Sequence, residues 1–302
     1  MRSYAERLAE FAWRLRTIAQ QNASLAHHSL LGIGGMTDVL VFAGCEEELL
    51  AALAQAWQLE LPVRVFGGLT NCLLPAAPLR GVTILNRMSG LYFEEGYRLR
   101  VAAGTRVARV ACEAVRRGWD GLTWATGLPG TVGGMVVNNA GAFGGTTSDS
   151  LLSAEIVSPS GIQTVGAEWF NFQYRSSCLK AGKSSAREVV LRVTFQLREG
   201  EPAQLQARAA EYKQRRLQTQ PPGRSLGSVF ANPPGDYAGR LIEAAGLKGE
   251  RRGDVLISPQ HANFFINQGQ GTAAEYLELI QLAQTEVRRQ FGIELELEIE
   301  II

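Results

Sequence analysis

The chain has 302 residues, of which 46% are hydrophobic, so it can bury a sizeable core and we expect two or three lobes. Its 30 Lys and Arg residues against 29 Asp and Glu residues give a formal net charge of +1, which argues against nucleic acid or an acidic membrane as the main partner. No apolar run approaches a membrane span and no signal-peptide pattern opens the chain, so we expect a cytoplasmic protein. The four cysteines and three histidines are scattered, which predicts reduced thiols and no metal site.

The first third of the chain is predicted to hold a helix, a βαβ unit and a second pair of strands. The second strand of the βαβ unit runs directly into Gly67-Gly68-Leu69-Thr70-Asn71, a glycine turn at a strand end, where α/β units commonly hold phosphates. Apolar spacing predicts helices over 3–20, 46–57 and 105–117, the last closed by Gly118, and strands over 38–42, 63–66, 82–86 and 97–102.

Residues 127–145 (GLPGTVGGMVVNNAGAFGG) are a glycine-dense stretch. Glycine at this density costs backbone entropy, so it indicates left-handed backbone or close approach to another body. Bare N–H groups in such a turn can point at the phosphate oxygens of an anionic cofactor, and Asn138 and Asn139 add amide groups beside them. Tight turns that pack backbone on backbone are the alternative. The stretch carries neither GxGxxG after a strand nor a Walker-type lysine.

The second half of the chain is predicted to end in a separate α+β lobe. Thr272 and Glu275 have the spacing of a capping box at the start of the last helix. In the final ten residues, alternation predicts a strand whose Ile and Leu side chains face the core and whose Glu side chains share the other face. The expected elements are a hairpin of strands 154–157 and 162–165, strands over 191–197 and 261–267, and helices over 202–218, about 236–245 and 273–290.

Several motifs follow one another between residues 127 and 299. They read GLPGTVGG and NAGAFG within 127–144, YRSS at 174–177, GSVFANP at 227–233, AGRLI and GLKG within 238–249, SPQHANFFIN at 258–267 and FGIELELEI at 291–299. In this order they resemble the UDP-N-acetylenolpyruvoylglucosamine reductase (MurB) family, over about residues 29–302. The segment from Arg175 to Ser228 has no room for the extra insertion of the longer subclass, so the chain resembles the shorter, type II form.

The resemblance implies an α+β protein with a FAD-binding fold of the vanillyl-alcohol oxidase (PCMH) type. That fold occupies two lobes, and a C-terminal α+β domain binds the substrate. The corresponding domains are expected over residues 1–86, which include the N-terminal helix, over 87–205, and over 206–302.

The resemblance also implies an enzyme, a FAD-dependent oxidoreductase. It would use NADPH to convert UDP-N-acetylglucosamine enolpyruvate to UDP-N-acetylmuramate in peptidoglycan synthesis. By resemblance, Arg175 and Glu298 polarise the substrate carboxylate and Ser228 donates a proton. Arginine suits this role because it stays charged and can hold a carboxylate at two points. The implied substrate-binding residues are Tyr174, Asn232 and His261.

The implied FAD-binding residues lie in the two glycine turns. The first turn departs from the family's GGGSN because Leu69 and Thr70 replace glycine and serine. A leucine costs about 1–2 kcal/mol if that position needs a positive φ. Phe143 and Ala231 also replace the Tyr and Lys that are usual in the family. The cofactor-binding set is Gly67, Gly68, Thr70 and Asn71 in the first turn and Gly127, Pro129, Gly130, Thr131, Gly133, Gly134, Asn139, Ala140 and Gly141 in the second.

Two other classes of protein fit the same residues. One is a divergent flavin oxidoreductase of this fold with another substrate or impaired catalysis. The other is a nucleotide-binding regulatory protein without turnover. The expected partners are a small UDP-sugar and NADPH, with no nucleic acid and no membrane, and the expected state is a monomer or a weak homo-oligomer.

Overall fold

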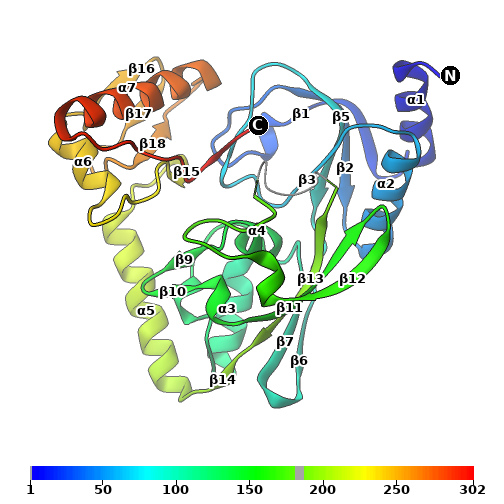
Figure 1. Ribbon diagram of the computed structural model, residues 1–302, viewed down its shortest axis with the longest axis horizontal. Coiled ribbons are helices and arrows are strands. Elements are labelled where there is room, and N and C mark those ends of the chain that lie inside the picture. Colours follow the sequence, from blue (N-terminus) through cyan, green and yellow to red (C-terminus); the bar gives the residue numbers. More distant parts are fainter. Residues whose placement is uncertain (1, 181–186) are drawn as a thin grey trace. The chain divides into compact units, whose positions relative to one another are not determined.

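A computed structural model describes residues 2–180 and 187–302. The chain divides into two compact units, each assembled from segments that are separated in the sequence (Figure 1). The predicted three-domain division stays a prediction. Both expected FAD-binding lobes contribute to the first unit, while two segments of the expected first lobe belong with the C-terminal part. The first unit holds Met1–Ala23, Thr37–Gly68 and Arg80–Gln214, and the second holds Ser24–Met36, Leu69–Leu79 and Arg215–Ile302.

Five helices follow the predicted ranges to within a few residues, the first is shorter than predicted, and α4 was not predicted, because it lies inside the glycine-dense stretch. The first helix ends at Arg14, and the chain enters a strand at Ala19. The helices are α1 Tyr4–Arg14, α2 Glu46–Gln58, α3 Val107–Arg116, α4 Val132–Val137, α5 Pro202–Thr219, α6 Ala238–Ala244 and α7 Ala273–Phe291.

The strands of the described residues form three larger sheets and several short pairs. In the first unit they are β1 Ala19–Ser24, β2 Met36–Ala43, β3 Val63–Phe66, β5 Leu79–Asn86, β6 Leu91–Glu94, β7 Arg98–Ala102, β8 Trp119–Asp120, β9 Gly141–Ala142, β10 Gly145–Thr146, β11 Leu151–Ser158, β12 Gly161–Gly166, β13 Val189–Gln196 and β14 Arg198–Glu199. In the second they are β4 Cys72–Leu73, β15 Arg224–Ser228, β16 Arg251–Arg252, β17 Val255–Ile257, β18 Phe264–Asn267 and β19 Glu300–Ile301.

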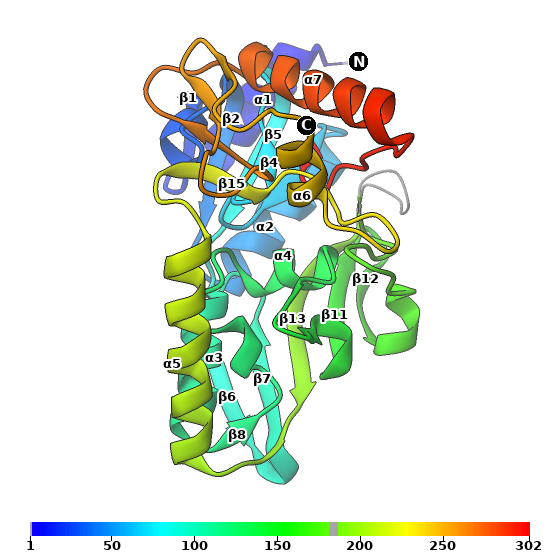
Figure 2. The same cartoon turned by 90° about the vertical axis from the view of Figure 1, so that its left-hand side faces the viewer.

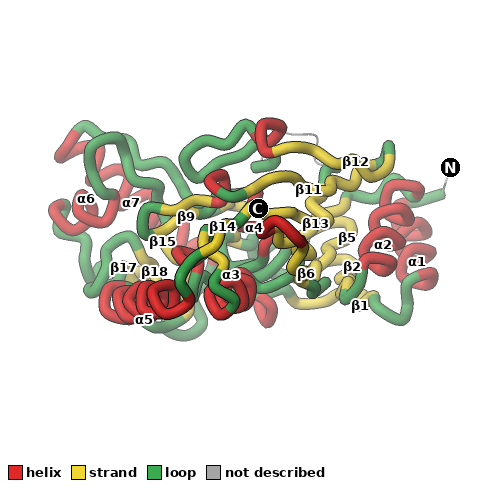
Figure 3. Tube along the Cα trace, turned by 90° about the horizontal axis from the view of Figure 1, so that it is seen from below, coloured by secondary structure: helices red, strands yellow, loops and turns green. Residues whose placement is uncertain are grey.

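The first unit contains two sheets with separate cores. In the order β1-β2-β5-β3, strand β5 lies between the two strands of the predicted βαβ unit and pairs in parallel with β3. Helices α1 and α2 lie side by side against this sheet in Figures 1 and 3, and Phe11 and Leu49 are buried in its core. The second sheet has the order β12-β11-β13-β7-β6, and its core includes Val110 of α3 and Val136 of α4. The predicted hairpin is confirmed as β11 and β12.

The second unit packs α7 on the antiparallel sheet β15-β18-β17-β16. Figure 2 shows α7 and α6 in this unit, the former in orange-red and the latter in yellow. The Thr272 hydroxyl accepts the Glu275 N–H and the Glu275 carboxylate accepts the Thr272 N–H, so the predicted capping box is confirmed. Gly292, at φ 68°, ends the helix in the left-handed region.

Two strand predictions in this unit are wrong in extent. The strand predicted from His261 begins at Phe264, because the Ser258 hydroxyl holds the preceding residues in a turn by accepting the His261 N–H at 3.3 Å. Of the final ten residues, the structure assigns only β19 to a strand, and it pairs in parallel with β4. Ile301 is 47% exposed and does not face the core.

Tyr276 supplies a stability prediction for this core. Its ring is fully buried beside Phe265, and burial raises the pKa of its hydroxyl. Within residues 2–180 and 187–302, that hydroxyl has no hydrogen-bond partner. Leaving a buried polar group unsatisfied costs about 1–3 kcal/mol. We expect Tyr276→Phe to keep or raise the free energy of unfolding in urea. A loss above about 1 kcal/mol would mean that the hydroxyl is satisfied.

Candidate active site

The predicted site residues fall into both units. No cluster of His, Cys, Asp and Glu in the described part of the chain could hold a metal ion, and no described helix is long and apolar enough to cross a membrane. The first unit carries Gly67, Gly68, Gly127, Pro129, Gly130, Thr131, Gly133, Gly134, Asn139, Ala140, Gly141, Tyr174 and Arg175, and the second carries Thr70, Asn71, Ser228, Asn232, His261 and Glu298.

The two glycine turns meet within the first unit. A Cβ added at Gly67, at the end of β3, would overlap the hydroxyl of Thr131 and lie 3.0 Å from its Cβ. Thr131 is the N-cap residue of α4, the helix that follows the second turn. Backbone packing and cofactor binding both predict close approach at such a glycine, and at Gly67 the close approach is made by the protein itself.

The start of α4 is fixed to the loop between β7 and α3. Gly133 N–H donates to the Ala103 carbonyl at 2.8 Å, Val132 N–H donates to the Thr105 carbonyl at 3.0 Å, and the Gly130 carbonyl accepts the Val107 N–H at 3.1 Å. These bonds hold the first turn of the helix from one side. The N–H groups of Val132 and Gly133, which lack helical partners at a helix start, are therefore satisfied by protein carbonyls and are not open to an anion.

Two features of this stretch fit a bound cofactor. A Cβ added at Gly133 would lie 3.2 Å from Ala103 Cβ, so that glycine is explained by packing. A Cβ at the exposed Gly134 would meet no protein atom closer than 3.8 Å, so packing does not explain it. The Thr126 side chain, 7% exposed, precedes the stretch, and no described residue gives its hydroxyl a partner. Open backbone at Gly134 leaves room for a ligand, and an unsatisfied buried hydroxyl such as that of Thr126 is a group that a polar ligand could satisfy.

Asn139 joins the second glycine turn to the segment that carries Arg175. Its buried side chain accepts the Ser148 N–H at 3.1 Å and donates to the Gln173 carbonyl at 2.9 Å. The side-chain amide is therefore used inside the protein. The φ of Asn139 is 40°, so its backbone is in the left-handed region and turns the chain at this point.

Arg175 occupies a strained turn. Gln173 and Ser176 exchange both backbone hydrogen bonds, at 3.0 and 3.1 Å, so Tyr174 and Arg175 are the two central residues. Arg175 has a φ of 55°, which costs a side-chain-bearing residue about 1–2 kcal/mol. Tyr174 is 60% exposed, and the guanidinium lies 5.6 Å from its ring centroid. Strain of this kind is concentrated at functional sites.

Leu69 in the first glycine turn is also strained. Its φ is 49° and its side chain is 3% exposed. The position therefore requires the left-handed backbone that glycine supplies, and the leucine offsets the strain of about 1–2 kcal/mol by burying its side chain.

Ser228 ends strand β15 after an irregular pairing with β18. Ser225 is opposite Ile266 and Ser228 is opposite Phe264, so one extra residue stands on the β15 side. Gly227, at φ 78°, takes the left-handed conformation within this bulge. A bulge bends a strand and redirects the side chains next to it, and Ser228 is the residue that follows the glycine.

Glu298 lies beside the same strand end. Its N–H donates to the Val229 carbonyl at 2.9 Å, and the Ala231 N–H donates to the Glu296 carbonyl at 2.9 Å. The side-chain amide of Asn71 donates to the Glu298 carbonyl at 3.3 Å. The segments that carry Ser228 and Glu298 are thus neighbours within the second unit.

His261 and Asn232 flank this region in the same unit. Burial lowers the pKa of His261, so its ring is neutral at pH 7. Its Nδ1 accepts the Asn263 N–H at 3.3 Å, which leaves the proton on Nε2. The exposed Asn232 accepts the Ala238 N–H at 3.1 Å at the start of α6.

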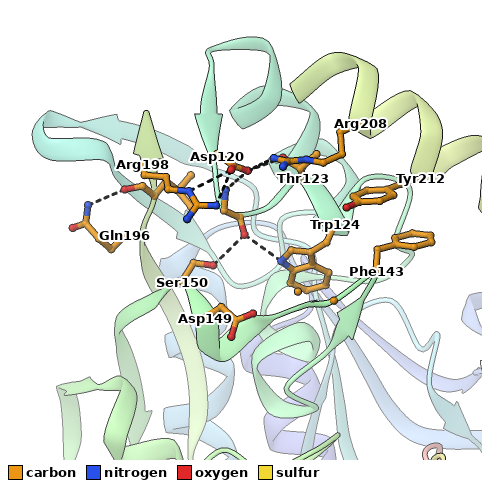
Figure 4. A pocket seen from close by; sticks show the side chains of 14 residues that line it. Asp120, Thr123, Trp124, Phe143, Asp149, Ser150, Gln196, Arg198, Arg208 and Tyr212 are labelled. Atoms are coloured by element: carbon orange, nitrogen blue, oxygen red, sulfur yellow. Dashed lines mark hydrogen bonds and ion pairs between the residues drawn. The ribbon is translucent and has the colours of Figure 1, made fainter. Parts of the chain in front are cut away.

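A cavity of about 520 Å³ in the first unit contains none of the predicted site residues. Figure 4 shows Arg198 and Arg208 directed at Asp120, at 2.9 and 2.6 Å. Burial alone would raise the pKa of Asp120, but these hydrogen bonds hold it below its ordinary value. The rings of Phe143 and Tyr212 stack at 4.3 Å along the same cavity. Asp120, Arg198 and Arg208 pair with one another, and the Asp149 carboxylate accepts the Thr146 N–H, so we interpret the cavity as a structural contact between β8, β14 and α5.

Comparison with known proteins agrees with this architecture. Residues 37–166 match the family described as FAD binding domain. Together with the α+β fold, this match defines the chain as a flavin-dependent oxidoreductase that uses FAD. Residues 218–302 match the family described as UDP-N-acetylenolpyruvoylglucosamine reductase, C-terminal domain.

Full-length relatives identify the family. The UDP-N-acetylenolpyruvoylglucosamine reductase of Rubrobacter xylanophilus is 39% identical, over 96% of this chain and 97% of its own length. That of Chloroflexus aggregans is 40% identical, over 93% and 96%. The crystal structure of the Thermus caldophilus MurB matches with a TM-score of 0.80 and 34% identity, over 93% of this chain and 98% of that one. The chain belongs to the UDP-N-acetylenolpyruvoylglucosamine reductase family, as its motifs predict.

Sequence reasoning missed two residues of this region. Thr126 precedes the glycine stretch, and Asn263 was one variable position inside the HANFFIN motif. A buried threonine without a partner and a buried asparagine with several partners look alike in a sequence, because only their long-range contacts differ.

Proposed function

We propose that this protein uses NADPH to reduce the enol ether of UDP-N-acetylglucosamine enolpyruvate to UDP-N-acetylmuramate, through a bound FAD. The observation that carries the proposal is the junction in the second unit, where the Val229 carbonyl accepts the Glu298 N–H at 2.9 Å. It joins the segment of the predicted proton donor to the segment of the predicted acid. Relatives named UDP-N-acetylenolpyruvoylglucosamine reductase align with almost the whole chain.

The reaction adds a hydride to one carbon of the enol ether and a proton to its neighbour. When bound, the flavin supplies the hydride chemistry. Ser228 donates the proton, and Arg175 and Glu298 polarise the substrate carboxylate while negative charge develops on it. A fixed guanidinium suits this task because its charge and geometry do not change during the reaction.

We assign FAD binding to the residues around the two glycine turns. Gly134 leaves room for the cofactor at the first turn of α4, and the Thr126 hydroxyl provides a buried polar group that needs a partner. Asn139 acts through the backbone turn that its side chain fixes. The other assigned residues are Gly67, Gly68, Thr70, Asn71, Gly127, Pro129, Gly130, Thr131, Gly133, Ala140 and Gly141.

The remaining assignments concern the substrate and the setting. Tyr174 is exposed and suits contact with a sugar nucleotide, and Asn232 and His261 are assigned to substrate binding as well. Neutral His261 would meet the ligand through its Nε2–H. We further propose that the protein works in the cytoplasm as a monomer or weak homo-oligomer.

A flavin spectrum and a steady-state assay test the proposal together. We expect the purified protein to carry FAD, released on denaturation, and to oxidise NADPH only when the UDP-sugar enol ether is present. A flavoprotein that oxidises NADPH with other acceptors but not with this enol ether would favour the divergent oxidoreductase. A protein that takes up no flavin from excess FAD would favour the regulatory class.

A further inference from the structure

We propose that Asn263 is a positioning residue that holds Ser228 and Glu298 in the register needed for proton donation. The inference rests on the proposed function, because it concerns the same proton step. Asn263 precedes strand β18 and contacts the loop after Ser228, and its side chain is 2% exposed. Its role follows from three sets of contacts.

The side-chain amide of Asn263 makes the two hydrogen bonds that the backbone of a neighbouring strand would make. Its Oδ1 accepts the Phe230 N–H at 2.9 Å, and its Nδ2 donates to the Phe230 carbonyl at 2.8 Å. One amide group therefore satisfies both main-chain groups of a single residue. Asparagine is the shortest side chain that offers an acceptor and a donor in this arrangement, and aspartate keeps only the acceptor.

The backbone of Asn263 holds the preceding residue of the same loop. Its carbonyl accepts the Val229 N–H at 2.9 Å, and the Val229 carbonyl in turn accepts the Glu298 N–H at 2.9 Å. Asn263 is thus connected to the Glu298 segment through one residue, Val229. Ser228 is bonded covalently to Val229, so a shift of Val229 moves the proton donor and the acid together.

We call the contacts of Asn263 with Val229 and Phe230 the clamp. The third set of contacts joins this clamp to His261. The Asn263 N–H donates to Nδ1 of the buried imidazole at 3.3 Å. His261 packs edge-on against Phe264, which is the residue opposite Ser228 in the sheet. The clamp therefore lies between His261, an assigned substrate residue, and Ser228, the assigned proton donor. The Oδ1, Nδ2, N–H and carbonyl groups of Asn263 all make hydrogen bonds within the protein.

Asn267, at the other end of strand β18, offers a matched control. It is 3% exposed, and its side chain donates to the Leu31 carbonyl at 3.0 Å and accepts the N–H groups of Gly269 and Gly271 at 3.1 and 3.0 Å. It is a similarly buried amide, and its side chain makes three main-chain hydrogen bonds, against two for the side chain of Asn263. None of the three bonds of Asn267 reaches the Ser228 loop, so Asn267 separates a general loss of stability from a loss of positioning.

The experiment compares Asn263→Ala with Asn267→Ala in the full-length FAD-loaded protein. Both variants should unfold at lower urea concentration. We expect kcat with the enol ether to fall about 10- to 100-fold for Asn263→Ala and less than about threefold for Asn267→Ala, since small misplacement of a reacting group costs this much. The solvent deuterium isotope effect on turnover should rise for Asn263→Ala alone, while the rate at which NADPH bleaches the flavin stays at the parent value.

Asn263→Ser decides the matter if the alanine variant does not fold, because serine is neutral and its single hydroxyl can bond one of the two Phe230 main-chain groups but cannot reproduce the pair. It should show the same isotope effect with a smaller fall in kcat. Equal kinetics for the two alanine variants, or an Asn263 loss without a change in isotope effect, would overturn the inference. A parent protein that does not turn over the enol ether would instead overturn the proposed function.

Discussion

Replacing Ser228 by alanine is expected to lower turnover of the enol ether by about 10²- to 10⁴-fold, the usual cost of losing a positioned general acid. The substitution removes one hydroxyl from the end of β15 and leaves the bulge at Gly227 in place. Reduction of the flavin by NADPH needs no proton from Ser228, so the flavin should bleach at the parent rate when it is mixed rapidly with NADPH. The turnover of Ser228→Cys should lie between that of the parent protein and that of Ser228→Ala, because a thiol can donate a proton but is larger than a hydroxyl.

Ser225 provides the control for that substitution. It is a buried serine on the same strand, opposite Ile266. Ser225→Ala should turn over the enol ether at close to the parent rate, with any loss confined to stability. If Ser228→Ala matches Ser225→Ala in turnover, the proton comes from another group and the assignment of Ser228 fails.

Replacing Gly134 by alanine is expected to weaken FAD binding at least about tenfold, which equals ~1.4 kcal/mol. The added methyl group would meet no protein atom closer than 3.8 Å, so it fits the protein alone. Alanine in a helix is favoured over glycine by about 1 kcal/mol, so the free energy of unfolding of the FAD-free protein should hold or rise. Flavin fluorescence titration and urea unfolding measure the two quantities separately.

The neighbouring glycine has the opposite expectation. A Cβ at Gly133 would lie 3.2 Å from Ala103 Cβ, so Gly133→Ala should lower the free energy of unfolding of the FAD-free protein. Parent-like FAD affinity in Gly134→Ala would mean that this backbone does not approach the cofactor. The second glycine turn would then be a packing device only.

Local elements of the fold could be predicted well from the sequence. The α7 capping box and the hairpin turn before Gly161 are set by neighbouring residues, so their patterns are sufficient. The final residues alternate as a strand does, yet Leu297 makes only an isolated bridge with Phe230. Alternation reports which side chains are buried and carries no information on which partner is available.

Long-range pairing explains what the sequence could not supply. Residues 24–36 and 69–79 belong to the second unit through contacts such as that of Asn267 with the Leu31 carbonyl, and nothing local in either segment indicates this. The residues of the candidate site also divide into those that local motifs predict and those that only long-range contacts reveal. Motifs identified Arg175 and Ser228 from the resemblance, whereas the strained φ of Arg175 and the clamp made by Asn263 depend on the folded chain.

The proposed reaction reduces the carbon–carbon double bond of an enolpyruvyl UDP-sugar, so its product can be identified by mass spectrometry after complete reaction with excess NADPH. We expect a single product that is heavier than the substrate by two hydrogen atoms and matches UDP-N-acetylmuramate, formed in equal amount to the NADPH consumed. NADPH oxidation that leaves the mass of the UDP-sugar unchanged would show that the enol ether is not the substrate.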